Sequence, residues 1–143
     1  MSEQSIKQLS VFIENKSGRV SEVTGILGDA GVNIRGFSVS DTAEFGILRL
    51  VVDRPDEAAN ALKAASFTVR EDDVICIDLP DVPGGLAGVL KLVASAGVNI
   101  EYVYSLIATY VVINVADVER AIHLLADKPV RLVSQAEIAA AKA

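Results

Sequence analysis

Gly31-Val-Asn-Ile34 recurs in the chain 66 residues later as Gly97-Val-Asn-Ile100. The residues upstream of the tetrapeptide repeat at the same separation, from Leu9 and Ile75 to Ala30 and Ala96. A single tetrapeptide can recur by chance, but a shared pattern of glycine and apolar residues around it indicates an internal repeat. We therefore read the chain as two related copies of one structural unit.

Each copy combines two hydrophobic periodicities. Leu9, Val11 and Ile13 occupy alternate positions, which is the period of a β-strand with one buried face. Gly18 then opens a stretch whose apolar residues fall on one stripe of a helix. Gly31 follows that stretch and suits the left-handed position at a helix C-terminus. The first part of each copy is therefore a strand followed by an amphipathic helix.

The second part of the first copy continues with a strand over 33–40, a turn over 41–44 and a strand over 45–53. Pro55 suits the first turn of a second helix, and residues 67–70 give a last strand. The order strand, helix, strand, strand, helix, strand is that of the ferredoxin-like motif. The sequence therefore predicts an α+β fold of two tandem ferredoxin-like βαββαβ modules, each with an antiparallel sheet and its helices on one face.

The repeat also places a boundary between two domains. We expect the first domain over 1–72 and the second over 73–143, with the acidic run Glu71-Asp72-Asp73 as a solvated turn between them. The second domain ends in an alanine-rich segment that begins with Ser134-x-x-Glu137, the pattern of a capping box. A short C-terminal helix is therefore expected.

Composition excludes several classes of function. The 143 residues are 51% hydrophobic and carry 13 Lys and Arg against 19 Asp and Glu, so the formal net charge is −6. This balance offers no basic surface to nucleic acid or to an anionic membrane. One Cys, one His and no Trp exclude an internal disulfide framework and a dense metal site, and we expect no metal and no cofactor. The N-terminus does not resemble a signal peptide, so a cytoplasmic protein is expected.

The turn between the first strand and the first helix repeats well. It reads Asn15-Lys-Ser-Gly18-Arg-Val20 in the first copy and Asp81-Val-Pro83-Gly84-Gly-Leu86 in the second. A glycine at a helix start lets a ligand approach backbone N–H groups, which favour a carboxylate or phosphate. The amides of Asn15 and Asn33 could recognise an ammonium and a carboxylate together. The alternative is that these residues serve only turn and cap geometry.

The turn, the amphipathic helix and the Gly-Val-Asn-Ile segment resemble the ACT domain family of small regulatory modules that bind amino acids. The resemblance covers residues 8–71 and 74–134. In this family the effector is bound between two paired domains, beside these turns. The positions that the resemblance assigns to ligand binding are Asn15, Gly18, Arg19, Val20, Asn33 and Ile34 in the first copy and Asp81, Pro83, Gly84, Leu86, Asn99 and Ile100 in the second.

The two copies differ in charge at these turns. Asp81 replaces Asn15 and would repel a carboxylate, and Gly85 stands where the first copy has Arg19. One strand further on, Glu101 replaces Arg35. We therefore expect the first copy to hold the carboxylate of an effector and do not expect two equivalent sites.

The resemblance implies a regulatory protein without catalytic residues. We expect it to sense an amino acid, to act in trans on a metabolic enzyme or transporter, and to form a homo-dimer or larger homo-oligomer. Its exposed sheet edges could pair side by side within the chain or between two chains. One alternative is an interaction module that has lost its ligand. The other is a small ferredoxin-like hydrolase, for which Arg19 with Asn33 or Asn15 would have to surround a phosphate.

Overall fold

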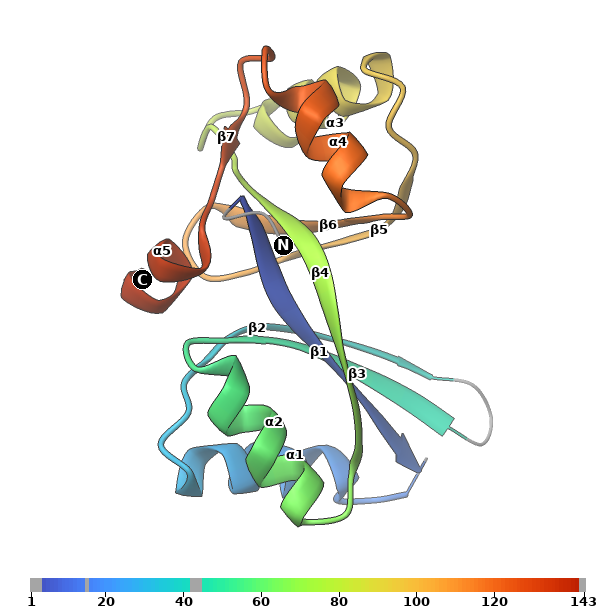
Figure 1. Ribbon diagram of the computed structural model, residues 1–143, viewed down its shortest axis with the longest axis vertical. Helices are drawn as coiled ribbons and strands as arrows, with labels where there is room; N and C mark the ends of the chain where they lie inside the picture. Colours follow the sequence, from blue (N-terminus) through green and yellow to red (C-terminus); the bar gives the residue numbers. More distant parts are fainter. Residues whose placement is uncertain (1–3, 15, 42–44, 142–143) are drawn as a thin grey trace. The chain divides into compact units, whose positions relative to one another are not determined.

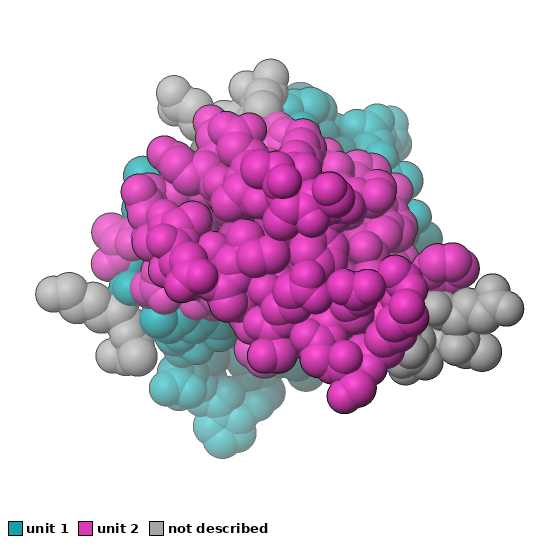
Figure 2. All heavy atoms as spheres, turned by 90° about the horizontal axis from the view of Figure 1, so that it is seen from below, with its two compact units in different colours: residues 1–6, 73–137, 141–143 teal, residues 7–72, 138–140 magenta. Residues whose placement is uncertain are grey.

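The computed structural model describes residues 4–14, 16–41 and 45–141. Within them the chain forms two compact units, which are coloured separately in Figure 2. Unit 2 takes residues 7–72 and 138–140 and holds the first copy of the repeat. Unit 1 takes residues 73–137 and 141 with residues 4–6, and holds the second copy.

Unit 2 is built on four strands in the order β2-β3-β1-β4 (Figure 1). β1 pairs antiparallel with β3, and β3 pairs antiparallel with β2. The elements in chain order are β1 (Ser5–Glu14), α1 (Arg19–Asp29), β2 (Ile34–Asp41), β3 (Phe45–Val52), α2 (Pro55–Ala64) and the first part of β4 (Thr68–Asp78). This is the predicted ferredoxin-like order.

The core of unit 2 lies between its sheet and its two helices. Leu9 faces Leu50 and Val11 faces Leu48 across β1 and β3, so alternate residues of both strands point to one face. That face packs against the apolar stripes of α1 and α2, which lie side by side in Figure 1. The buried members are Leu9, Val11, Ile13, Val23, Leu27, Val32, Leu48, Leu50, Val52, Ala58, Ala59 and Leu62.

Unit 1 repeats this arrangement with the strand order β7-β4-β6-β5. Its core is again formed by alternate strand residues and the stripes of two helices, with Ile75, Ile77, Val89, Val93, Val111, Ile113, Ile122 and Leu125 among its buried members. Its elements after β4 are α3 (Gly85–Ser95), β5 (Ile100–Ser105), β6 (Tyr110–Val115), α4 (Val118–Leu125) and β7 (Arg131–Leu132). The terminal helix α5 (Gln135–Ala140) follows.

Glycine in the left-handed backbone region ends the first helix of each unit, as predicted. Gly31 has φ 73° and Gly97 has φ 83°. The N–H of Gly31 donates to the O of Gly28 at 3.0 Å, and the N–H of Val32 donates to the O of Leu27 at 2.9 Å. These two bonds form a Schellman motif, and the same pair of bonds follows α3.

The prediction of a turn at Glu71-Asp72-Asp73 is wrong, because these residues lie within the continuous strand β4. Ser10 Oγ donates to Asp72 Oδ2 at 3.0 Å, and Arg70 Nε donates to Asp72 Oδ1 at 3.0 Å. The carboxylate is thus satisfied inside a sheet rather than by water. β1 also departs from the expected single buried face, since Ser10 is fully buried together with the apolar residues beside it.

Gly85, the first residue of α3, marks a close approach of two backbone segments. A Cβ at this position would overlap the carbonyl oxygen of Pro80. The backbone N–H of Gly85 donates to the O of Val82 at 3.0 Å, so the turn is held tightly around the helix start. A residue with a side chain is therefore excluded at the position where unit 2 carries Arg19.

We predict that Gly85→Ala lowers the free energy of unfolding of unit 1 by about 1–3 kcal/mol, because the added methyl group meets backbone that has to shift. Gly88→Ala is the matched control in the same helix, where a Cβ meets nothing within 4 Å. The control should be neutral or stabilising by up to about 1 kcal/mol.

Urea titration followed by tyrosine fluorescence reports on unit 1, since the chain has no Trp and its three tyrosines lie on β5 and β6. Equal stability of the two alanine variants would contradict the steric account.

Candidate functional site

The two strand-to-helix turns have the same backbone geometry. Gly18 precedes α1 with φ 84° and ψ −3°, and Gly84 precedes α3 with φ 82° and ψ 0°. Both glycines are exposed, and no described atom lies within 4 Å of the place where a Cβ would stand. No described side chain caps either helix. The first N–H of each helix is bonded within its turn, Arg19 N–H to Lys16 O at 3.3 Å and Gly85 N–H to Val82 O at 3.0 Å. The N–H groups that follow receive no side-chain cap, which is the arrangement that anion recognition at a helix start uses.

In unit 2 this turn carries a cluster of charges around Arg19. Arg19 Nη1 donates to Glu22 Oε2 at 2.9 Å, and Nη2 donates to Glu14 Oε1 at 3.3 Å. Lys16 Nζ lies 2.9 Å from the other oxygen of Glu14. The hydrogen bond and positive charge of Lys16, followed by the charge of Arg19, lower the pKa of Glu14. The predicted residue Asn15 lies outside the described residues.

In unit 1 the corresponding turn has no cation. Gly85 replaces Arg19 for the steric reason given above, while Asp81, Pro83 and Leu86 are exposed around the turn. Leu86 keeps 45% of its surface exposed and Val20, its counterpart, keeps 38%. The predicted difference in charge between the copies thus has a structural cause.

The predicted asparagines lie at the other end of the first helix. Asn33 follows α1, and its backbone N–H donates to Asp53 Oδ1 at 2.8 Å, while its side chain is exposed. Eleven residues of α1 separate this point from Gly18, a distance of about 16 Å along the helix axis. Asn99 has the same place after α3. One unit by itself therefore does not bring its turn and its asparagine together.

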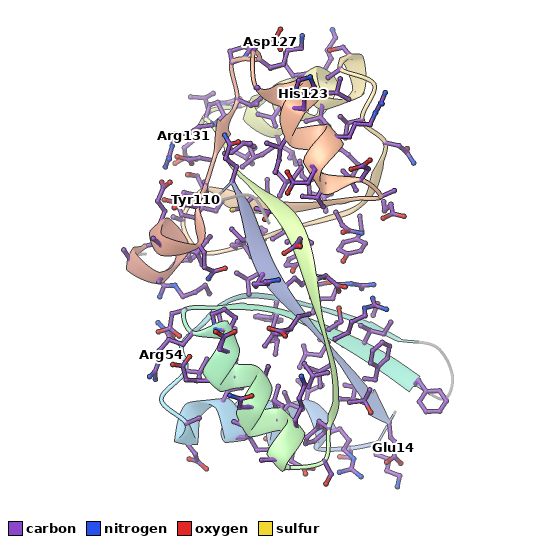
Figure 3. The ribbon with its side chains drawn as sticks, viewed as in Figure 1. Glu14, Arg54, Tyr110, His123, Asp127 and Arg131 are labelled. Carbon is purple, nitrogen blue, oxygen red and sulfur yellow. The ribbon has the colours of Figure 1, made fainter. Side chains whose placement is uncertain are left out.

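Arg54 fixes the end of α1, a role that the sequence analysis missed. Its Nη2 donates to the backbone oxygens of Gly31 and, at 3.4 Å, Ala30. A cation at a helix C-terminus satisfies carbonyl groups that have no partner within the helix. Arg54 stands at the start of α2, as labelled in Figure 3, so it ties the two helices of unit 2 together.

A β-bulge follows each Gly-Val-Asn-Ile segment. The register of β2 against β3 shifts between Ile34 and Gly36, and that of β5 against β6 shifts between Ile100 and Tyr102. Arg35 and Glu101, the pair with opposite charge, are the residues at the two bulges. A bulge changes the direction of a side chain, so Arg35 and Glu101 do not follow the regular alternation of their strands.

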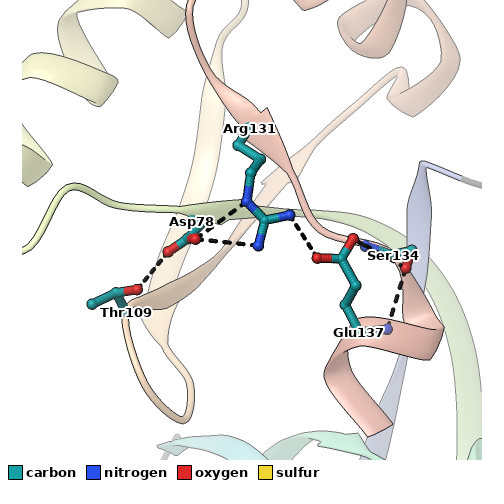
Figure 4. A network of polar contacts seen from close by, with 5 residues as sticks. All are labelled: Asp78, Thr109, Arg131, Ser134 and Glu137. Atoms are coloured by element: carbon teal, nitrogen blue, oxygen red, sulfur yellow. Dashed lines mark hydrogen bonds and ion pairs between the residues drawn. The ribbon is translucent and has the colours of Figure 1, made fainter. Parts of the chain in front are cut away.

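A polar network joins the C-terminal segment to β4 within unit 1 (Figure 4). Arg131 Nη1 donates to Glu137 Oε2 at 2.6 Å, and Arg131 Nη2 lies 3.2 Å from Asp78 Oδ2. Thr109 Oγ1 donates to the other oxygen of Asp78. The predicted capping box is confirmed, because Glu137 N donates to Ser134 Oγ at 3.2 Å and Ser134 N donates to Glu137 Oε1 at 3.3 Å.

The single histidine and the single cysteine of the sequence make none of the polar contacts described above. His123 lies exposed on α4 (Figure 3), and Cys76 is buried in β4. Burial raises the pKa of Cys76 to about 12, so its thiol is not a nucleophile near neutral pH. No group of three or more potential metal ligands occurs within residues 4–14, 16–41 and 45–141. None of the helices in that part of the chain combines the length and apolar content of a membrane span.

A family model described as an ACT domain pair matches residues 4–141. The chain belongs to this family. A crystal structure of a protein from Bacteroides thetaiotaomicron is 41% identical to it, with a TM-score of 0.88 over 95% of this chain and 96% of that chain. Units 1 and 2 are therefore the members of an ACT domain pair.

More distant structures share the fold. The ligand-free regulatory subunit of aspartate kinase from Thermus thermophilus is 20% identical, with a TM-score of 0.59 over 87% of this chain and 94% of that chain. The corresponding subunit from Thermus flavus is 20% identical, with a TM-score of 0.57 over 84% and 90%. No protein of curated function matches the chain.

The network around Glu137 predicts a pH dependence of stability. The hydrogen bond from Arg131, followed by that from the backbone of Ser134, lowers the pKa of Glu137 from 4.5. A carboxyl group whose pKa is lowered by folding stabilises the folded state above its unfolded pKa, and the stabilisation is lost as the pH falls through the folded pKa.

We predict that Glu137→Gln reduces the free energy of unfolding at pH 7 by no more than about 1 kcal/mol, because the ion pair is solvent-exposed. The difference from the unsubstituted protein should vanish below the folded pKa, in urea titrations between pH 7 and pH 3. Glu71→Gln, on β4, is the matched control for removing one exposed carboxylate. A Glu137→Gln difference that stays constant over this pH range would contradict the assignment.

Proposed function

We propose that this ACT domain pair senses a free amino acid and regulates a separate metabolic enzyme or transporter in the cytoplasm. The amino acid would favour one packing arrangement of ACT units over another, and the partner would respond to that change.

The observation that carries the proposal is the geometry repeated at Gly18 and Gly84. Two exposed glycines hold the same left-handed backbone before α1 and α3, and no described side chain caps either helix. If the turn served only to reverse the chain, the helix would not need to start without a side-chain cap. A ligand carboxylate, by contrast, can bind the backbone N–H groups at such a helix start directly. The asymmetry between Arg19 and Gly85 assigns the carboxylate to unit 2.

The placement of the asparagines supports a site that draws on two units. Within one unit, Asn33 and Gly18 stand at opposite ends of α1, so an effector of amino-acid size cannot contact both. A site in which Gly18, Arg19 and Val20 face the asparagine and isoleucine of a second unit satisfies this constraint. Asn15 would complete the first side of that site. The candidates for the second side are Asn33, Ile34, Asn99 and Ile100. The turn of unit 1 that corresponds to the first side is formed by Asp81, Pro83, Gly84 and Leu86.

A second copy of the chain is the proposed partner for the exposed edge of unit 2. β2 ends the strand order of this unit, and Phe37 and Val39 on it are 64% and 49% exposed. They stand opposite Leu50 and Leu48, so they extend the apolar face of the sheet beyond the core. An apolar edge strand of this kind is stabilised by pairing with another strand.

The surroundings of Arg19 argue against the hydrolase alternative. A phosphate loop needs a guanidinium that is available to an anion, but Arg19 contacts the carboxylates of Glu14 and Glu22. A phosphate with two negative charges would meet two carboxylates at the same place, whereas an amino acid brings an ammonium as well. The charges therefore suit a zwitterion better than a phosphate.

We predict that at least one of the twenty amino acids stabilises the protein in a thermal-shift panel. A ligand that binds only the folded state at 100 times its Kd adds about 2.7 kcal/mol to the free energy of unfolding. Arg19→Gln should reduce the shift, while Lys63→Gln, on the exposed part of α2, should not. Absence of any shift across the panel would overturn the sensor and favour the alternative of an interaction module without a ligand.

We predict that the protein self-associates through β2. Val39→Lys, which places a charge on the apolar edge, should weaken dimerisation at least about tenfold in sedimentation velocity experiments. Val82→Lys is the control, because Val82 is 63% exposed and lies away from β2 in the sequence, before α3. A monomer at all concentrations, or equal dissociation constants for the two variants, would refute edge pairing.

A further inference from the structure

Unit 2 contains a hollow of about 390 Å³ beside the Arg19 turn. Its walls come from the end of β1, the first turn of α1, the start of β3 and the connection between α2 and β4. Because all of its lining residues belong to unit 2, its shape depends on that unit alone. Its volume lies within the range of pockets that hold small organic molecules.

Aromatic residues contribute to the lining of the hollow. Phe12, Phe45 and Phe67 are three of the four phenylalanines in the chain. Phe67 packs partly against the core of unit 2, but Phe45 keeps 58% of its surface exposed. Such rings offer apolar and stacking contacts that a bound aromatic group would complete, and aromatic pairs add to the effect of area burial.

Charged residues line the same hollow, and one of them, Glu14, stands directly opposite Phe45 across β1 and β3. Glu14, Arg19 and Glu22 all contribute to the wall, and Arg19 holds one carboxylate with each of its terminal nitrogens. An α-amino acid carries one charge of each sign, so its carboxylate can take one terminal nitrogen while its ammonium takes the displaced glutamate. This exchange replaces one ion pair with two and leaves no charge without a partner.

Ser66 adds a strained backbone position to the wall. It has φ 70°, in the left-handed region, and its N–H donates to the O of Lys63 at 3.0 Å at the end of α2. Glycine usually occupies this position of a helix C-terminus, because a side chain is strained there. The serine places a hydroxyl group, which can donate or accept a hydrogen bond, on the wall of the hollow.

We infer that the hollow receives the side chain of an aromatic α-amino acid whose charged groups are held by Arg19 and Glu14 or Glu22. The inference rests on the proposed function and deepens it, because it names the chemical class of the effector. Unit 1 has no counterpart of Arg19, since Gly85 leaves no room for a side chain. Unit 2 is therefore the part of the chain that selects the effector.

The test is a calorimetric titration of the full chain with L-phenylalanine, L-tyrosine and L-tryptophan. At least one should bind. The matching analogues with one charged group removed, such as 3-phenylpropanoate and 2-phenylethylamine, should bind at least about tenfold more weakly, since each loses one ion pair. L-alanine, which keeps both charges but lacks the ring, should be weaker by a similar factor.

Two variants locate the site. Phe45→Ala should weaken binding of the aromatic amino acid about tenfold, because it removes a wall of the hollow. Val103→Ala is the control, since Val103 is an exposed apolar residue on β5 of unit 1 that does not line the hollow, and the affinity of this variant should stay within about twofold.

The outcomes separate this inference from the proposed function. If another amino acid stabilises the protein and no aromatic one binds, the hollow is not the effector pocket, although the sensor stands. Equal affinities in Phe45→Ala and Val103→Ala would also contradict the assignment of the hollow as the effector pocket. If none of the twenty amino acids binds, the proposed function falls and this inference falls with it.

Discussion

Four glycines in the left-handed region of the backbone set the limits of the first helix in each ACT unit: Gly18, Gly31, Gly84 and Gly97. Residues with a Cβ rarely adopt this conformation, so the chain can leave the first strand and enter the second only at these points. The helix between them then has a fixed length, and its apolar stripe meets the sheet in one register. No described side chain caps either helix start, and these turns are the places at which we propose that the ligand binds.

Much of this fold is predictable from the sequence, because the same hydrophobic periodicities and glycine positions occur in both copies of the repeat. The periodicity of Leu9, Val11 and Ile13, the glycine caps and the Ser134-x-x-Glu137 capping box are local signals, and the structure follows them. The continuity of β4 was not predictable, since an acidic run normally indicates solvent. Only the pairing of Asp72 with Ser10 and Arg70 allows a strand there.

The candidate site is only partly predictable from the sequence. The turns and the loss of charge from Arg19 to Gly85 are visible in the sequence, but the contact with Pro80 that explains the loss depends on the fold. Arg54 and Arg131 also escaped prediction, because each contacts residues that lie far from it in the sequence. The aromatic hollow gathers Phe12, Phe45 and Phe67 from three separate segments, and no local pattern relates them.

These features describe an ACT pair in which two units of one topology have diverged. Unit 2 keeps a cation at the helix start and an aromatic hollow beside it, whereas the close packing of Gly85 removes that cation from unit 1. The proposed effector site and the proposed pairing edge on β2 both lie in unit 2. Binding at the first can change pairing at the second if the effector has different affinities for the paired and unpaired forms.

The binding stoichiometry tests this central claim most directly. Calorimetric titration of the full chain with the amino acid that stabilises it should give one bound molecule per chain, and Arg19→Gln should abolish this binding at the same concentrations. Two equivalent molecules per chain, or one that survives the loss of Arg19, would contradict the account.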